Sequence, residues 1–146
     1  MDQELNVKLA IYQHFAELGT SPSPTQVASR AGVGVQDVLE IFPHLRSKRV
    51  LLLEGDGESI RMAPPFSGVP TQHRVASGGV TYYANCAWDA LGIPAALRRP
   101  GVVHSRCEAS LEPLELEVSD QAPPTSDWRF HCAVPAVKWW KDIVFT

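Results

Sequence analysis

The stretch VTYYANCAWDAL, residues 80–91, passes from a β-rich run into a helical pattern. Val80 to Ala84 is rich in β-branched and aromatic residues and predicts a strand. Asn85 is a favoured N-cap residue, so we expect a short helix over the rest of the stretch. Cys86 and Asp89 are three residues apart and would lie on one face of that helix.

The pair of a thiol and a carboxyl has two interpretations. A thiol in the first turn of a helix meets unpaired N–H groups and the positive end of the helix dipole, which favour the thiolate. Asp89, one turn further on, could then share a bound reactant with Cys86 as a proton donor. In the other interpretation, Cys86 is a small core hydrophobe and Asp89 only complements the helix dipole. The local pattern leaves both open.

Downstream of this stretch, the sequence predicts a small sheet. Gly92 and Pro94 should break the helix, and Pro94 can start a further turn through Leu97. The second half carries several β-rich or alternating segments, two of which form a hairpin around Glu112-Pro113. The predicted strands cover residues 102–110, 114–118, 128–134 and, after Trp139-Trp140, 143–145.

Upstream, three helical patterns precede a hairpin. The first covers residues 4–18, with apolar residues at helical spacing. These are Leu5, Leu9, Tyr12, Phe15 and Leu18. Two more helices are predicted at 25–31 and 35–47, and Pro43 can kink the last or end it early. Its inward side chains should be Val38, Leu39, Phe42 and Leu45. Residues 50–54 and 59–62 flank the turn dipeptide Asp56-Gly57 and predict a hairpin.

Three helices followed by a hairpin are typical of a winged helix, whose second and third helices form a helix-turn-helix. Residues 63–72 contain three prolines and a glycine and are interpreted as a linker. We therefore predict an α+β protein. Residues 1–72 would form a three-helix, winged-helix-like domain with its linker, and residues 73–146 a small mixed β-sheet domain with short helices.

Composition and charge narrow the classes of function. The chain has 146 residues, a net charge of −3 and no apolar run of membrane-spanning length. Its acidic N-terminus lacks a signal-peptide layout, so we expect a cytoplasmic protein. Residues 1–72 hold six Lys/Arg against eight Asp/Glu. The expected recognition helix is mostly acidic or neutral, so nucleic acid is not an expected partner.

The cysteine pattern indicates thiols rather than disulfides. The cysteines are Cys86, Cys107 and Cys132. Their number is odd and none forms a CxxC motif. A zinc site could be imagined from them with His104 and His131, but the spacings match no standard zinc module. His73 is most simply a solvated side chain, and the four tryptophans are core or pocket wall.

An ordered set of motifs runs through the second half. The motifs are NCAWDAL (85–91) with PA (94–95), VHSRC (103–107), LELEV (114–118), VP (134–135) and WWKDI (139–143). In this order they resemble organomercurial lyase, also called alkylmercury lyase. The first half is similar to the helical, winged-helix-like N-terminal region of that family, with PFS (65–67) at its end. The resemblance covers nearly the whole chain, and its most specific element is Cys86-x-x-Asp89.

The resemblance implies cleavage of a carbon–mercury bond, giving a hydrocarbon and Hg(II). By resemblance, Cys86 is the mercury-binding thiolate, and Asp89 is the proton donor and can also hold the metal. Thiolate is a soft ligand that suits Hg(II), and its ligation makes the attached carbon more basic. Cys107 matches a family cysteine regarded as structural. No organic cofactor is implied. Small thiols would remove the Hg(II), with hand-off to them or to a mercuric reductase.

A second catalytic cysteine of the family is not matched. In related chains it follows the strand at 143–145, where this sequence ends at Thr146. Cys132 lies before the tryptophans, so either it substitutes from a neighbouring strand or the chain lacks the second thiol. Our hypothesis is that the polypeptide is truncated at its C-terminal end, at a UGA codon meant for selenocysteine. The nucleotides after codon 146 would test it.

Two alternatives to an enzyme stay open. One is a winged-helix, metal-responsive regulator whose second half senses metal through its thiols. The other is a mercury-binding protein that ligates the metal through Cys86 without turnover.

Overall fold

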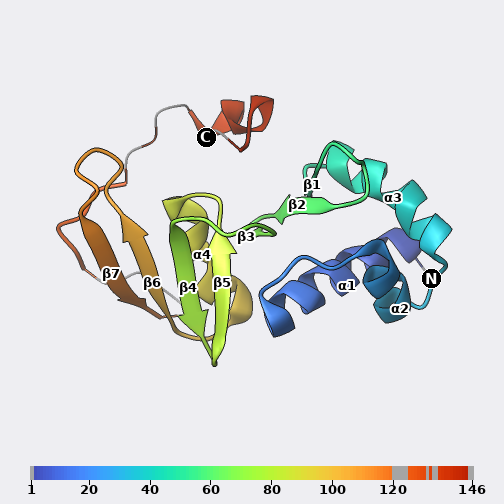
Figure 1. Cartoon of the computed structure of the whole chain (residues 1–146), viewed down its shortest axis with the longest axis horizontal. Coiled ribbons are helices and arrows are strands. Elements are labelled where there is room, and N and C mark those ends of the chain that lie inside the picture. Colours follow the sequence, from blue (N-terminus) through green and yellow to red (C-terminus); the bar gives the residue numbers. More distant parts are fainter. Residues whose placement is uncertain (1, 120–124, 131, 133–134, 145–146) are drawn as a thin grey trace.

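The N-terminal half of the chain is helical. We describe a computed structural model in which residues 2–119, 125–130, 132 and 135–144 are placed (Figure 1). The three expected helices are present as α1 (Gln3–Leu18), α2 (Pro24–Ala31) and α3 (Val35–Ser47). Local capping sets their limits, because Asp2 accepts hydrogen bonds from the first turn of α1 and Gly19 ends it in the left-handed conformation.

Pro43 lies inside α3, which continues past it to Ser47. The predicted range of this helix is therefore confirmed, and of the two alternatives for Pro43 the early end does not occur. Pro43 lacks the N–H that would bond to the preceding turn, and this loss costs about 3 kcal/mol or more in a helix interior. Phe42 and Leu45, on either side of the proline, are fully buried. Their burial holds the last turn in the helical conformation.

The buried face of α1 coincides only in part with the apolar residues noted at helical spacing, of which Phe15 is fully buried. Leu5, Leu9 and Leu18 are about half exposed, at 49%, 48% and 53%. The buried stripe is instead Val7, Ala10, Ile11 and Phe15, with His14 beside it. The helix carries two apolar stripes, each with a helical period, and periodicity alone does not choose between them. Packing against α2 and α3 selects the second.

A three-stranded antiparallel sheet follows the helices. Its strands are β1 (Leu52–Leu53), β2 (Ile60–Ala63) and β3 (Phe66–Ser67), in the order β1-β2-β3. The first two form the expected hairpin. The third lies in the segment predicted as a linker, where Phe66 pairs with Ala63 and is buried. This segment is thus partly regular structure, because Phe66 has a core position to fill.

A four-stranded sheet forms the other half of the molecule. Its strands are β4 (His73–Ser77), β5 (Val80–Ala84), β6 (Gly101–Arg106) and β7 (Pro113–Val118). Their order is β5-β4-β6-β7, and every pairing is antiparallel. The hairpin of β6 and β7 is as predicted, but the predicted mixed sheet is wrong. Each strand among the described residues turns back on its neighbour, so no parallel pair forms.

One helix, α4 (Ala87–Leu97), packs on a face of this sheet. It runs unbroken through Gly92 and Pro94, against the prediction of a break. Pro94 is buried, and a Cβ on Gly101 of β6 would come within 3.4 Å of its ring. Contact with the sheet therefore compensates for the hydrogen bond that the proline cannot donate.

The two halves share a continuous buried cluster that reaches from α1 to β6. Phe15 of α1 stacks on Phe66 of β3 with ring centroids 5.3 Å apart. The Tyr82 hydroxyl of β5 donates to the Ala16 carbonyl. A Cβ on Gly19 would come within 2.2 Å of the Thr81 carbonyl oxygen, so only glycine permits this approach. α1 therefore packs directly on the edge of the four-stranded sheet (Figure 1).

The C-terminal segment, by which we mean the described residues after Ser119, contains a short 3₁₀ helix, η1 (Ala136–Lys141). The strands predicted at 128–134 and 143–145 are wrong for the described residues 128–130, 132 and 143–144, which join neither sheet. The other predicted positions lie outside the described residues. A β-rich run becomes a strand only where a partner edge is available, and here side-chain contacts hold the segment instead. None of the helices in the described ranges has the length and apolar character needed to cross a membrane.

Candidate functional site

Cys86 is the N-cap residue of α4 rather than a member of its first turn. Its backbone is extended, with φ −146° and ψ 171°, and its carbonyl accepts the first helical hydrogen bond from Ala90 N–H at 3.0 Å. The predicted cap, Asn85, serves another purpose. Its side-chain amide donates to the carbonyls of Ile143 (2.9 Å) and Val144 (3.3 Å) in the C-terminal segment. The end of β5 thus places the thiol at the N-terminus of α4.

The thiol of Cys86 is partly buried, and this burial decides its charge state. Burial raises the pKa of Cys86 above its ordinary value, and the nearby Asp89 carboxylate raises it further. The backbone amides of Asp89 and Trp88 act in the opposite direction, as expected at a helix N-terminus. Burial outweighs the amides, so Cys86 is a thiol at neutral pH. A metal that binds its sulfur displaces the proton.

Asp89 lies in the first turn of α4, one turn from Cys86. Burial raises the pKa of its carboxyl from the ordinary 3.8 to about 6. A carboxyl with this pKa keeps a proton into the mildly acidic range and can donate it to a reacting atom. The structure therefore places a soft sulfur and a weak acid close enough to interact, with Cys86 at the N-cap instead of in the first turn.

Tyr12 of α1 is a neighbour of Asp89 that the sequence did not reveal. Burial raises the pKa of Tyr12, and the charge of Asp89 raises it further, so the two groups are close enough to interact electrostatically. The Tyr12 hydroxyl donates to the Pro64 carbonyl at 3.0 Å. In the sequence, Tyr12 was only one of the apolar residues at helical spacing over residues 4–18. The helical half of the molecule thus contributes a residue, Tyr12, near the Asp89 carboxyl.

The C-terminal segment brings Cys132 toward Cys86. Their separation is small enough for a charge on Cys132 to raise the pKa of Cys86. The ring of Phe130, two residues earlier, lies 5.6 Å from the ring of Trp88 in α4. Cys132 is exposed and lies outside any strand, so it reaches the site from an irregular segment. All three cysteines of the chain are thiols.

The other polar candidates lie apart from this pair. Cys107 follows β6 in a turn, where hydrogen bonds from Ser110 lower its pKa. His104 of β6 faces Glu115 of β7, with Nδ1 and Oε2 3.6 Å apart. Within the described residues, no three His, Cys, Asp or Glu side chains are close enough to hold a metal ion. His131, the remaining candidate ligand, lies outside the described residues.

His73 is buried, which corrects the prediction of a solvated side chain. It is the first residue of β4, only 6% exposed, and its ring Nδ1 lies 2.6 Å from the Ser105 hydroxyl oxygen. Burial lowers the pKa of His73, although Glu108 opposes this. The strand at residues 73–77 was not predicted because a proline-rich sequence, interpreted as a linker, comes directly before it. Burial alternates along residues 73–77 in the structure, but the sequence HRVAS has no matching alternation of apolar and polar residues that would have predicted it.

Comparison with known protein families identifies the family of this chain. The sequence model of the alkylmercury lyase family, MerB, matches residues 66–146, which include Cys86, Asp89 and Cys132. The chain belongs to the alkylmercury lyase family. No curated protein matches the chain.

A solved alkylmercury lyase shares the fold. The crystal structure of the mercury-bound form of MerB2 is 23% identical in sequence, with a TM-score of 0.68. The similarity covers 87% of this chain and 61% of that one. The chain thus spans less than two thirds of the length of the protein it matches. At this identity the match establishes the fold, here an α+β arrangement of helices with two antiparallel sheets.

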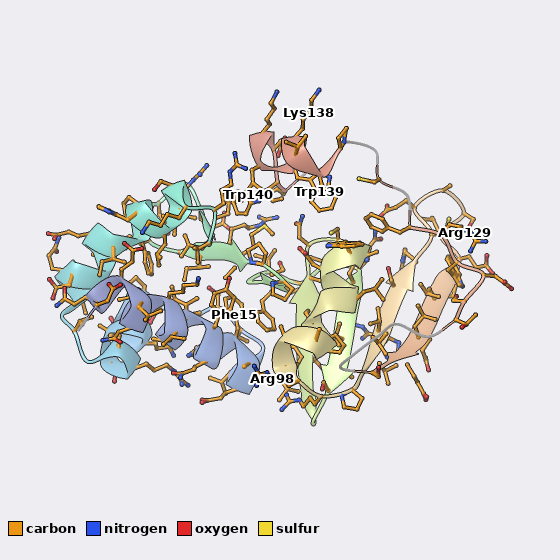
Figure 2. All side chains as sticks on the ribbon, turned by 180° about the vertical axis from the view of Figure 1, so that it is seen from behind. Phe15, Arg98, Arg129, Lys138, Trp139 and Trp140 are labelled. Carbon is orange, nitrogen blue, oxygen red and sulfur yellow. The ribbon has the colours of Figure 1, made fainter. Side chains whose placement is uncertain are left out.

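Aromatic side chains lie on α4 and in the C-terminal segment of this alkylmercury lyase homologue. Trp88 is 56% exposed next to Cys86 and leans on Phe130. Figure 2 shows Trp139 and Trp140 on the side of η1 that faces the rest of the molecule, whereas Lys138 points away. Both indoles are partly buried. An apolar surface of this kind suits the hydrocarbon part of an organic ligand.

Proposed function

We propose that this chain cleaves carbon–mercury bonds and releases a hydrocarbon and Hg(II). The observation that carries the proposal is the pairing of the Cys86 thiol with a carboxyl, Asp89, whose pKa burial raises to about 6. Thiolate sulfur is the ligand class that a soft cation such as mercury prefers. A neutral carboxylic acid one helical turn away supplies the proton that carbon needs.

The proposed reaction has two bond exchanges. Cys86 Sγ first bonds to the mercury of R–Hg–X, and the thiol proton leaves with X as HX. The sulfur donates electron density to the metal, which makes the mercury-bound carbon more basic. Asp89 then transfers its proton to that carbon, the C–Hg bond breaks, and the product is RH. The Asp89 carboxylate that remains can bond to the mercury, so charge is balanced and no oxidation occurs.

The environment of Asp89 suits this role. An exposed aspartate, with a pKa near 4, would hold a proton on roughly one molecule in a thousand at pH 7. With a pKa of about 6, roughly one in ten is protonated. The charge of Asp89 also raises the pKa of Tyr12, a residue of α1 in the helical half.

The direct test is release of benzene from a phenylmercury salt, followed by gas chromatography in the presence of excess small thiol. We expect protein-dependent benzene equal in amount to the substrate consumed. Tight binding of the phenylmercury without benzene would instead identify a mercury-binding protein that does not turn over. Absence of both binding and benzene would refute the proposal.

The rate of carbon protonation should follow the protonated fraction of Asp89. Replacing the Cys86 thiol proton by an organomercury group leaves the sulfur neutral, so the pKa of Asp89 stays near 6 in the complex. In a single turnover of the preformed complex, the rate should be constant below about pH 5. Above about pH 6 it should fall, approaching tenfold per pH unit. A rate that rises between pH 6 and 8 would show that the carboxylate acts as a base.

Cys132 is our candidate for a second sulfur ligand of the product. Hg(II) favours two soft ligands. Cys132 is close enough to Cys86 for its charge to raise the pKa of Cys86. We expect Cys132→Ser to weaken Hg(II) binding at least about tenfold, measured by competition with a small thiol. Cys107→Ser, outside the site, is the control and should bind as the wild type does. Equal affinity of all three proteins would assign the product to Cys86 and Asp89 alone.

The cellular role belongs to the same proposal. Hg(II) would pass to small thiols or to a mercuric reductase in the cytoplasm, as part of mercury detoxification. The winged-helix regulator gains no support from the surface between α1 and α3. That surface is a hollow of about 580 Å³ lined in part by Asp2, Glu4, Asp37 and Glu40. Such a surface repels phosphate, so we do not propose nucleic acid as a partner.

A further inference from the structure

The C-terminal segment is attached to the turn that carries Cys86. The side-chain amide of Asn85 donates to the carbonyl oxygens of Ile143 at 2.9 Å and Val144 at 3.3 Å. In the described structure these two residues join neither sheet, so strand pairing does not hold them. The polar side chain next to the thiol thus binds a part of the chain that is distant in the sequence.

Asn85 makes these hydrogen bonds instead of capping the helix. Asparagine is among the preferred N-cap residues. The cap position of α4 nevertheless belongs to Cys86, which makes no side-chain cap hydrogen bond. A carboxamide has two N–H donors, and this group suits two successive backbone carbonyls. The proposed reaction gives Asn85 no part in the chemistry, so its contacts call for a separate explanation.

A second contact attaches the segment on the other side of the thiol. Trp88 follows Cys86 by two residues, and its ring centroid lies 5.6 Å from that of Phe130. Trp88 is still 56% exposed and Phe130 43%, so both rings keep a free surface. Cys86 itself is half-buried. The C-terminal segment is therefore attached just before and just after the thiol.

The attachment is of a kind that can open. A side-chain hydrogen bond and an aromatic contact each contribute only modestly to stability in water. η1 is short, and 3₁₀ helices have poorer hydrogen-bond geometry than α-helices. Segments of this kind open locally while the rest of a protein stays folded. Opening would withdraw Trp139 and Trp140, which lie on the side of η1 that faces the rest of the molecule (Figure 2).

We propose that Asn85 is a positioning residue, which holds the C-terminal segment over Cys86 as a cover for the organic group of an arylmercury ligand. The inference rests on the proposed function, since it concerns the ligand of the same site. The aryl group of mercury bound to Cys86 Sγ would lie against the rings of Trp88 and Phe130. A flat aryl group gains stacking contacts with such rings. A methyl group offers them little surface, so the cover favours aryl over methyl.

Amide hydrogen exchange tests the attachment without mercury. The reporters are the backbone amides of Lys138 and Asp142, which donate hydrogen bonds within and next to η1. A detached turn of this length does not persist, so these amides exchange when the segment opens. We expect Asn85→Leu, which lacks the donors, to speed their exchange about tenfold. Gln36→Leu, an exposed amide on α3, is the matched control and should leave the exchange unchanged.

Ligand affinity supplies a second readout. In the Asp89→Asn background the carbon–mercury bond should stay intact, so binding can be measured by competition with a small thiol. The ligands are phenylmercury and methylmercury. We expect Asn85→Leu to weaken phenylmercury binding about tenfold and methylmercury binding less than about twofold. A purely structural role of Asn85 would weaken both equally.

Two results would overturn the inference. One is exchange at Lys138 and Asp142 that stays at the wild-type rate in Asn85→Leu. The other is an affinity ratio of phenylmercury to methylmercury that the variant leaves unchanged. Trp88→Leu removes the second contact and should give the same two effects, so it decides the question if Asn85→Leu does not fold. Neither measurement needs bond cleavage, so a failure here is distinct from a failure of the lyase reaction.

Discussion

Replacing Cys86 by serine should remove hydrocarbon release by a thousandfold or more while leaving the fold intact. A hydroxyl is a hard, weakly acidic group and does not replace a thiolate as a mercury ligand. A thousandfold loss corresponds to about 4 kcal/mol of transition-state stabilisation, which one lost metal–sulfur bond exceeds. The measurement is benzene release from phenylmercury at saturating small thiol.

The same substitution should raise stability slightly, because Cys86 is an N-cap residue. Serine is among the preferred N-cap residues and accepts a hydrogen bond from the first turn, so we expect a gain of about 0.5 to 1 kcal/mol in unfolding free energy. Loss of activity together with gain of stability separates a chemical role from a structural one. Cys107→Ser is the control and should keep its activity. Wild-type activity in the Cys86 variant would sink the assignment of the mercury ligand.

Replacing Asp89 by asparagine should separate binding from bond cleavage. The amide has nearly the shape of the carboxylic acid, so Cys86 should still capture the organomercurial. Without a donatable proton, the carbon–mercury bond should break about 10² to 10⁴ times more slowly. Mass spectrometry of the bound complex and benzene release measure the two steps. Equal losses in binding and cleavage would indicate that Asp89 only supports the structure.

Stability gives an independent check on the Asp89 variant. Because burial raises its folded pKa from 3.8 to about 6, the ionised carboxylate opposes folding. This penalty is absent below about pH 4, grows up to about pH 6 and stays constant above it. Asparagine removes the penalty. Asp89→Asn should therefore be more stable than the wild type at pH 7.5, by at most about 3 kcal/mol, and gain nothing at pH 4.

Asp56→Asn is a control of opposite sign. Hydrogen bonds from Ser59 and Glu58 lower the pKa of Asp56, so its carboxylate contributes stability above its ordinary pKa and loses it as pH falls through the lowered value. Its asparagine variant should lose stability at neutral pH and keep full activity. If both variants shifted stability in the same direction, the burial of Asp89 would not be the cause.

Elements with local signals were predicted well. The three N-terminal helices follow their caps and turn glycines, and the hairpin of β6 and β7 follows its alternation. The errors occur where contacts with residues distant in the sequence determine the local conformation. Pro94 stays helical where it is buried against the sheet, and Phe66 forms a strand inside the predicted linker where it is buried in the core. The apolar segment at 143–144 finds no strand edge among the described residues and instead accepts hydrogen bonds from Asn85.

The candidate site divides in the same way. The spacing of Cys86 and Asp89 is a property of the local chain, since residues three apart in a helix lie on one face. The order of this pair and the other motifs along the sequence was the basis of the resemblance to the alkylmercury lyase family. Their chemistry depends on burial, which no local pattern encodes. Tyr12 from one end of the sequence and Cys132 from the other lie beside them only after folding. The pKa of about 6 arises because the folded chain buries the carboxyl of Asp89, and this burial is decided by tertiary packing.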